Sequence, residues 1–144
     1  MDLGLPFAAA KFLCHPKENP SIKAFMRIYL QIPVAGNEFQ NSQIRRRQAA
    51  GPQSHVEFRT LILLQKSKCE VVPRLLAHRE TKQIEDGIIP GGYITYLVWE
   101  KVRGESLSSE KFWKLDPGSR QTIRDKFREV YPYVCLSLIK YILN

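Results

Sequence analysis

The alternation of hydrophobic and other side chains predicts a strand within residues 21–34, SIKAFMRIYLQIPV, which ends at Pro33. Side chains of a strand alternate between its two faces. One face of this strand is entirely apolar and carries Ala24, Met26, Ile28, Leu30 and Ile32. The other face carries Phe25, Arg27, Tyr29 and Gln31, so one arginine lies between two aromatic side chains.

Two later segments also predict strands. Residues 71–78 become strand-like from Leu75 onward, with Pro73 at the entrance. The stretch 93–107, YITYLVWEKVRGESL, begins with the β-branched, aromatic and leucine composition of a strand buried on both faces. It reaches Arg103-Gly104, where glycine allows a sharp change of direction. A polar linker over residues 80–92 joins the two segments, which predicts an antiparallel pair with a long connection.

The remaining periodic segments predict helices. Asn41 or Ser42 caps a short helix over residues 41–50, before Gly51-Pro52. The capping-box pattern Ser54-His55-Val56-Glu57 precedes an apolar run and predicts about three helical turns. Residues 108–113 predict one turn, and Asp116-Pro117 places an N-cap beside a first-turn proline. Apolar residues then recur at spacings of three and four, which predicts a helix with one hydrophobic face; they are Ile123, Phe127, Tyr131, Val134 and Leu138. Pro132 should kink or divide this helix.

These elements predict an α+β fold, with a small antiparallel or mixed sheet, one packed helix and C-terminal helices. Residues 1–20 are expected to be an irregular lead-in, because Pro6, Pro16 and Pro20 interrupt regular structure. Residues 21–103 then form the main unit and residues 104–144 a helical extension.

Composition restricts the class of protein. Of the 144 residues, 44% are hydrophobic and 25% charged, as in soluble globular proteins, and no apolar run reaches the ~20 residues that span a membrane. Three cysteines without a CxxC pair argue against a disulfide scaffold and favour a cytoplasmic location. The net charge of +8 is distributed along the whole chain and is not concentrated in one segment. Residues 1–57 hold 7 basic and 4 acidic groups, residues 58–103 hold 8 basic and 5 acidic groups, and residues 104–144 hold 7 basic and 5 acidic groups. Nucleic acid is therefore not the expected partner.

The order of these elements resembles the N-terminal lobe of the protein-kinase-like superfamily, nearest the aminoglycoside-phosphotransferase and choline-kinase-like branch. The resemblance covers about residues 22–134. It lies in Met26-Arg27-Ile28-Tyr29, in the helix start Val56-Glu57-Phe58, and in the hinge Trp99-Glu100-Lys101-Val102 before Gly104. It implies a nucleotide-binding lobe in which Arg27 stands for the phosphate-contacting lysine and Glu57 for the glutamate that orients it. The backbone of Glu100, Lys101 and Val102 would then receive the adenine edge.

The physical chemistry of Arg27 supports an ion pair. A cation inside a sheet is costly unless it is paired, and Glu57 on the next full helix is the expected partner. In the alternative, Arg27 lies on an exposed sheet face and Glu57 closes its capping box. Lys23 is a second candidate cation. Arginine keeps its charge but does not reproduce lysine geometry, so phosphate contact survives the exchange.

Several motifs of the family are missing. Only Gly4 lies in the first 35 residues, so no glycine-rich loop precedes the arginine strand. His-x-Asp and Asp-Phe-Gly are absent, which leaves no catalytic and no metal-binding residue to assign. The resemblance therefore implies an incomplete lobe that ends before the catalytic loop, binds ATP weakly and transfers no phosphoryl group alone.

Two other expectations follow from the sequence. The alternative function is a basic interaction module that binds nucleic acid or an acidic protein. The apolar end of the chain, residues 132–144, is expected to pack back on the sheet, to self-associate or to aggregate, because it holds several large hydrophobic side chains.

Overall fold

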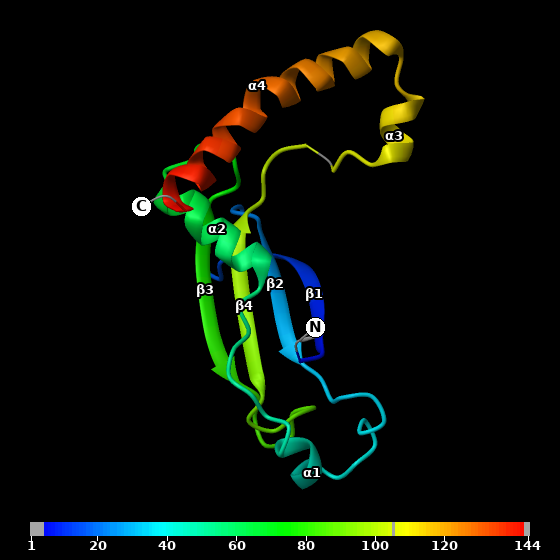
Figure 1. Cartoon of the computed structure of the whole chain (residues 1–144), viewed down its shortest axis with the longest axis vertical. Helices are drawn as coiled ribbons and strands as arrows, with labels where there is room; N and C mark the ends of the chain where they lie inside the picture. The colour runs from blue at the N-terminus through cyan, green and yellow to red at the C-terminus, as the bar shows by residue number, and fades with distance from the viewer. Residues whose placement is uncertain (1–4, 105, 143–144) are drawn as a thin grey trace. The chain divides into compact units, whose positions relative to one another are not determined.

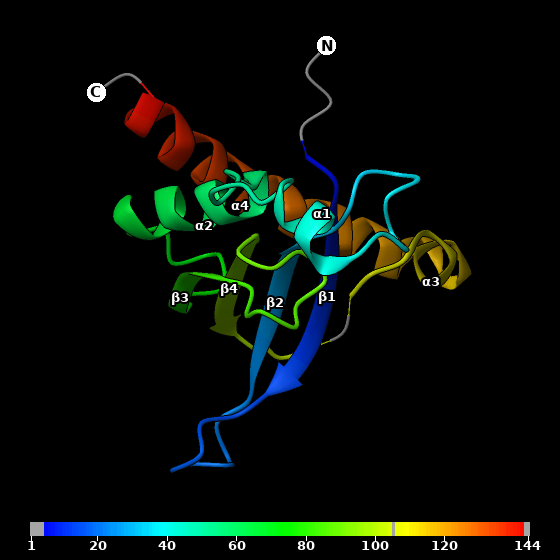
Figure 2. The same cartoon turned by 90° about the horizontal axis from the view of Figure 1, so that it is seen from below.

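The structure, a computed structural model, describes residues 5–104 and 106–142, with side chains described up to residue 135. The described residues form a four-stranded antiparallel sheet in the order β1-β2-β4-β3 (Figures 1 and 2). The predicted α+β class is confirmed. The strands are β1 Phe7–Cys14, β2 Ala24–Gln31, β3 Leu75–Lys82 and β4 Tyr93–Glu100. The helices are α1 Ser42–Arg46, α2 Val56–Lys66, α3 Ser109–Lys114 and α4 Pro117–Ile142.

The chain divides into two compact units. The sheet unit comprises residues 1–58 and 75–101, and so contains all four strands, α1 and the first turn of α2. The helical unit comprises residues 59–74 and 102–144, and so contains the rest of α2 together with α3 and α4.

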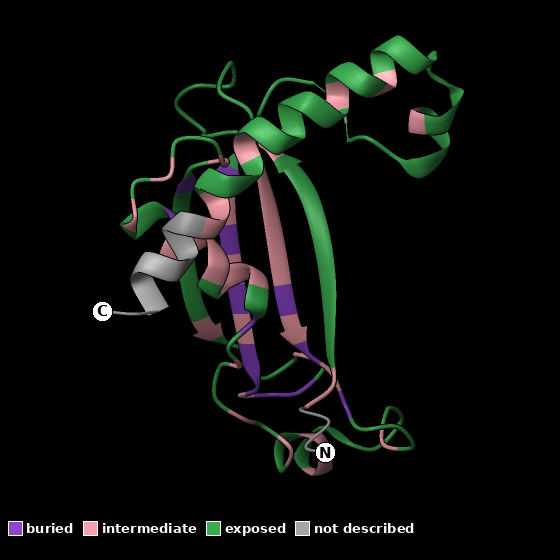
Figure 3. Ribbon diagram, turned by 45° about the horizontal axis from the view of Figure 1, so that its top comes forward, coloured by how far each residue is buried: buried purple, intermediate pink, exposed green. Residues whose placement is uncertain are grey.

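The two faces predicted for β2 are confirmed, and they differ in burial. Figure 3 shows the alternation of buried and intermediate residues along β4. On the inner face, β4 contributes buried side chains at every second position, namely Tyr93, Thr95, Leu97 and Trp99. On the outer face, Met26, Ile28 and Leu30 of β2 and Ile94, Tyr96 and Val98 of β4 are only half-buried. The expectation that β4 is buried on both faces is therefore wrong. The mixed face that carries Arg27 and Tyr29 is the better buried one, and the uniformly apolar face is the more open.

The expectation of an irregular lead-in is wrong for residues 7–14, which form β1. The prolines that motivated it flank this strand and do not interrupt it, and proline is tolerated beside an edge strand. Pro6 lacks an N–H to donate, but its carbonyl still accepts a hydrogen bond from Ile32 N at 3.1 Å just before the strand. The pairing with β2 then continues without a break from Phe7 opposite Gln31 to Cys14 opposite Ala24.

The predicted antiparallel pairing of β3 with β4 is confirmed. Strand β3 begins at Leu75 as expected but continues to Lys82, inside the segment predicted as a linker. Its charged side chains are compatible with a strand because β3 is the edge of the sheet and most of its residues are exposed. The connection to β4 is correspondingly shorter.

The helices largely follow their predicted caps. Asn41 Oδ1 accepts a hydrogen bond from Ile44 N at 3.0 Å, although α1 ends at Arg46, earlier than expected. Ser108 caps α3, and Asp116 Oδ1 accepts from Ser119 N at 3.0 Å at the start of α4. Pro132 lies inside α4 and does not divide it (Figure 1). The predicted packing or self-association of the apolar tail depends on side chains from residue 136 onward, which lie outside the described set.

Three glutamines join the loops at one end of the sheet, a feature that the sequence did not predict. The amide of Gln31, which is 1% exposed, donates to Gln48 O at 2.7 Å and accepts from Ala50 N at 3.0 Å. Gln83 donates to Gln31 O at 2.8 Å and accepts from Ile89 N at 2.8 Å. Hydrogen bonds therefore connect both the loop after α1 and the loop before β4 to the end of β2.

Candidate functional site

Arg27 and Glu57 form an ion pair on the inner face of the sheet. Nη1 of Arg27 in β2 donates to Oε2 of Glu57 in the first turn of α2 at 2.6 Å. The predicted pairing is confirmed. Helix α2 begins at Val56, so His55 and not Ser54 precedes it, and the carboxylate of Glu57 turns to the sheet. The alternative, with Arg27 exposed and Glu57 closing a capping box, is not what the structure shows.

Tyr29 completes this pair. Its hydroxyl donates to the same Oε2 of Glu57 at 2.5 Å, so one carboxylate oxygen receives both the arginine and the tyrosine. Burial raises the pKa of the Tyr29 hydroxyl, and the bond to Glu57 raises it further, so Tyr29 remains a donor at neutral pH. Burial opposes the charge of Arg27, but contacts with Tyr29 and Glu57 outweigh it and raise the guanidinium pKa. Arg27 is therefore a permanent cation.

The ion pair remains accessible. The side chain of Arg27 is 32% exposed and that of Glu57 is 31% exposed. Water therefore reaches about a third of the surface of each side chain. Arginine has five N–H donors, so the contact made by Nη1 leaves donors for a second acceptor.

An aromatic cluster packs against Tyr29. The ring of His55, 8% exposed, stacks on Tyr29 at a centroid distance of 3.7 Å, and Phe7 lies edge-on to His55 at 4.8 Å. Within the described part of the chain, Nε2 of His55 is buried and has no hydrogen-bond partner. Burial lowers the pKa of His55, and the nearby charge of Glu57 opposes this only in part.

The lowered pKa of His55 predicts a loss of stability in mild acid. The folded pKa lies below the unfolded value of about 6.5, so the unfolded chain takes up the proton first as the pH falls. The contribution of neutral His55 is complete above that unfolded pKa and is lost as the pH falls through the folded one. We expect the melting temperature to fall between about pH 7.5 and pH 5.5, and to fall less in His55→Phe, which keeps the aromatic stack. Equal pH slopes for the two proteins, measured by thermal unfolding, would refute this role of His55.

A second cation lies beside Arg27. Lys11 of β1 is opposite Arg27 in the strand register, and its Nζ lies 4.0 Å from the centre of the Phe25 ring. Cζ of Arg27 lies 5.8 Å from the ring of Trp99. The inner face thus carries two positive charges, each beside an aromatic ring. Lys11 was not predicted as part of the site, because β1 was not predicted as a strand.

The expected hinge residues lie at the end of β4. Glu100 is the last residue of that strand, is exposed, and pairs with Ala24 at the start of β2. The backbone N–H of Lys101 donates to Lys23 O at 3.4 Å. Val102 is 50% exposed and belongs to the helical unit. The structure therefore places Glu100 beside the first residue of the strand that carries Arg27. Lys101 lies beside Lys23, the second candidate cation, which is exposed and directly precedes β2.

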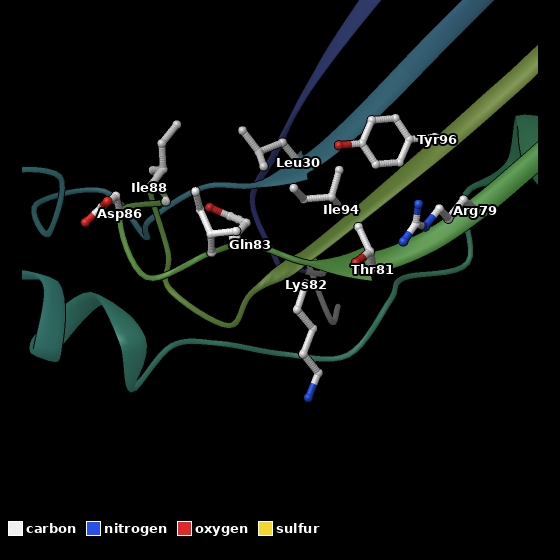
Figure 4. Close-up of a pocket in the computed structure, with 11 residues that line it drawn as sticks. Leu30, Arg79, Thr81, Lys82, Gln83, Asp86, Ile88, Ile94 and Tyr96 are labelled. Atoms are coloured by element: carbon white, nitrogen blue, oxygen red, sulfur yellow. The ribbon is translucent and has the colours of Figure 1, made fainter.

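The outer face of the sheet has a cavity of about 590 Å³ next to the β3–β4 connection (Figure 4). Leu30, Ile94 and Tyr96 form its apolar wall, and Arg79, Thr81 and Asp86 contribute polar groups. None of the candidate nucleotide-binding residues lines it. This cavity is separate from the ion pair, because Arg27 projects from the opposite face of β2.

Other candidate chemistry is accounted for by local structure. In the described part of the chain, no three His, Cys, Asp or Glu residues come together as a metal site. The expectation that the chain has no Asp-x-Gly is wrong, because Asp116-Pro117-Gly118 has this spacing; its Asp116 caps α4. Asp86-Gly87 belongs to a turn, in which Gly87 N donates to Ile84 O at 2.9 Å. Among the helices described, none has the length and apolar character to cross a bilayer.

No protein-family model, curated protein or solved structure matches the chain, so its function is inferred from the contacts above.

Proposed function

We propose that the sheet unit is a kinase-like nucleotide-binding lobe in which Arg27, oriented by Glu57, contacts the phosphates of ATP. The observation that carries this proposal is the 2.6 Å ion pair between β2 and the first turn of α2. Protein kinases require a pair of this kind between a strand lysine and a helix glutamate. Fold-level analogy alone would not support a function, but the analogy also specifies two residues at separate places in the chain, and those two residues are in contact.

The remainder of the proposed site follows from the neighbouring groups. Lys11 adds positive charge beside Arg27, and the ring of Trp99 lies between Arg27 and the end of β4. The backbone of Glu100 and Lys101, which lie at the end of the sheet unit, is proposed to receive the adenine edge. We expect weak affinity, because residues 15–23, which join β1 to β2, contain no glycine that would let backbone amides enclose the phosphates.

The proposal concerns binding and not phosphoryl transfer. Transfer requires metal-held phosphates and an oriented nucleophile, and the 144 residues contain neither His-x-Asp nor Asp-Phe-Gly. A cytoplasmic location accompanies the proposal, since ATP is available there and Cys14, Cys69 and Cys135 are not joined by disulfides in the structure.

Equilibrium binding of ATP to the full chain tests this function. We expect Arg27→Ala to weaken ATP binding at least about tenfold, because it removes a charge-assisted contact worth roughly 1.5–3 kcal/mol. Arg27→Lys should retain part of the affinity, since the positive charge remains. Adenosine, which lacks phosphates, should bind more weakly than ATP and be insensitive to Arg27→Ala.

The matched control is Arg79→Ala. Arg79 lies on β3 at the outer-face cavity, and its replacement changes the net charge by the same amount. We expect Arg79→Ala to bind ATP like the unchanged protein. Equal loss in both variants would indicate nonspecific attraction of a polyanion to a basic surface, and absence of ATP binding to the unchanged chain would likewise contradict the proposal.

A further inference from the structure

Strand β1 is an unprotected edge of the sheet (Figure 2). Seven of its eight residues are exposed, among them Phe7 at 45%, Phe12 at 46% and Leu13 at 56%. Its sequence, FAAAKFLC, has no proline or glycine and a single charge at Lys11. Its register with β2 contains no bulge. Natural proteins usually protect edge strands with charges, prolines or bulges.

The opposite edge has such protection. Strand β3, LLAHRETK, carries several charged residues and has a register irregularity between Leu75 and Ala77. The two edges of the same sheet therefore differ, and only β1 is suited to pair with another strand.

The backbone of β1 presents a regular set of hydrogen-bonding groups at this edge. Pro6 O accepts from Ile32 N, so the even-numbered residues of β1 direct their backbone groups to β2. The odd-numbered residues Phe7, Ala9, Lys11 and Leu13 direct theirs away from it. Among the described residues, no strand of the chain pairs with these outward groups.

We propose that β1 pairs with β1 of a second copy of this chain, antiparallel and about a two-fold axis, so that the two sheets become one. A two-fold interface requires a surface that is complementary to itself, and an antiparallel pair of identical strands meets this requirement. Because the axis is perpendicular to the sheet, the outer faces of both copies lie on the same side. The apolar outer face formed by Met26, Ile28, Leu30, Ile94, Tyr96 and Val98 then continues across the junction through Ala8, Ala10 and Phe12.

The charge of Lys11 favours one register between the two copies of β1. Centring the axis on Ala10 places Phe7 opposite Leu13 of the second copy and Ala9 opposite Lys11, so all four outward residues exchange backbone hydrogen bonds. Centring it on Lys11 would place two ammonium groups directly opposite each other, which is unfavourable. The pairing centred on Ala10 is therefore preferred.

Sedimentation equilibrium of the full chain over a range of concentrations tests the dimer. We expect a reversible monomer–dimer equilibrium that Ala9→Pro weakens at least about tenfold, because the change removes an outward N–H from each copy. The bonds between β1 and β2 do not involve the backbone of Ala9, so the circular dichroism of the variant should be unchanged. Ala9→Ser, which keeps the N–H, is the matched control and should dimerise normally. A monomer at every concentration, or equal dimerisation of the Pro and Ser variants, would overturn the proposal.

Disulfide trapping tests the register. Cβ atoms of directly opposed residues are about 4.5–5.5 Å apart, close to the range that a disulfide needs. We expect Ala10→Cys to give a covalent dimer under mild oxidation, above the background from the three native cysteines. Ala8→Cys, on the same face but displaced from the axis, should not exceed that background. Equal trapping of both variants would contradict the register centred on Ala10.

Discussion

Replacing Gln31 by leucine is expected to lower the free energy of unfolding by about 1–3 kcal/mol, although leucine has a similar volume. The side chain is 1% exposed, and its amide satisfies the carbonyl of Gln48 and the N–H of Ala50. Leucine leaves the carbonyl of Gln48 and the N–H of Ala50 without their side-chain partner. Each costs less than the about 1–3 kcal/mol of a fully buried unsatisfied group, because Gln48 and Ala50 are only half-buried and water can reach them. The effect should include loosening of the loop after α1, because these bonds fasten it to β2.

Urea unfolding at fixed temperature measures this effect. We expect a lower midpoint with an unchanged slope, as for a loss of stability without a change in the surface exposed on unfolding. Gln43→Leu is the matched control, since Gln43 is exposed in α1, and its midpoint should not move. Equal shifts in the two variants would show that the buried hydrogen bonds contribute little.

The second large effect is expected at the ion pair. Glu57→Ala should lower the free energy of unfolding by about 1–3 kcal/mol, because Arg27 and Tyr29 both lose their acceptor. The value lies below that of a fully buried pair, since each side chain is about a third exposed to screening solvent. In Arg27→Ala/Glu57→Ala the loss should be smaller than the sum of the single losses, by about 1–2 kcal/mol.

The same double-mutant cycle at Lys126 and Glu129 is the control. These residues form an exposed ion pair one turn apart in α4, with Nζ to Oε2 at 2.9 Å. Water and salt screen an exposed pair, so we expect no measurable coupling there. Additive losses at Arg27 and Glu57, with no coupling, would mean that this contact does not stabilise the first turn of α2 against β2.

The sequence was informative where one local rule determines the outcome. Alternation in β2 separated Arg27 from Met26 and Ile28, and the need of a cation for a counter-ion identified Glu57. Capping residues located the starts of α1 and α3. The caps and the strand alternation depend on residues close together in the sequence. The partner of Arg27 could be predicted because few acidic residues were candidates.

The sequence was uninformative where pairing between strands decides the structure. Strand β1 was not predicted because of the prolines near it. The effect of a proline depends on whether it interrupts a strand or flanks it, and here the prolines flank the strand. Lys11 joined the site only through its register opposite Arg27. Gln31 and Gln83 are 52 positions apart, and no local pattern marks a glutamine whose amide will be buried against a distant loop.

Mapping ATP on the chain by nuclear magnetic resonance tests the proposed lobe most directly. In a titration of ¹⁵N-labelled protein, we predict that the largest shift changes occur at the backbone amides of Arg27, Glu57 and Lys101, on the inner face and at the end of β4. Adenosine should move the Lys101 amide but leave Arg27 and Glu57 nearly unchanged, because it has no phosphates. Changes confined to the outer-face cavity around Ile94 and Tyr96, or spread evenly over exposed lysines, would contradict a kinase-like nucleotide site.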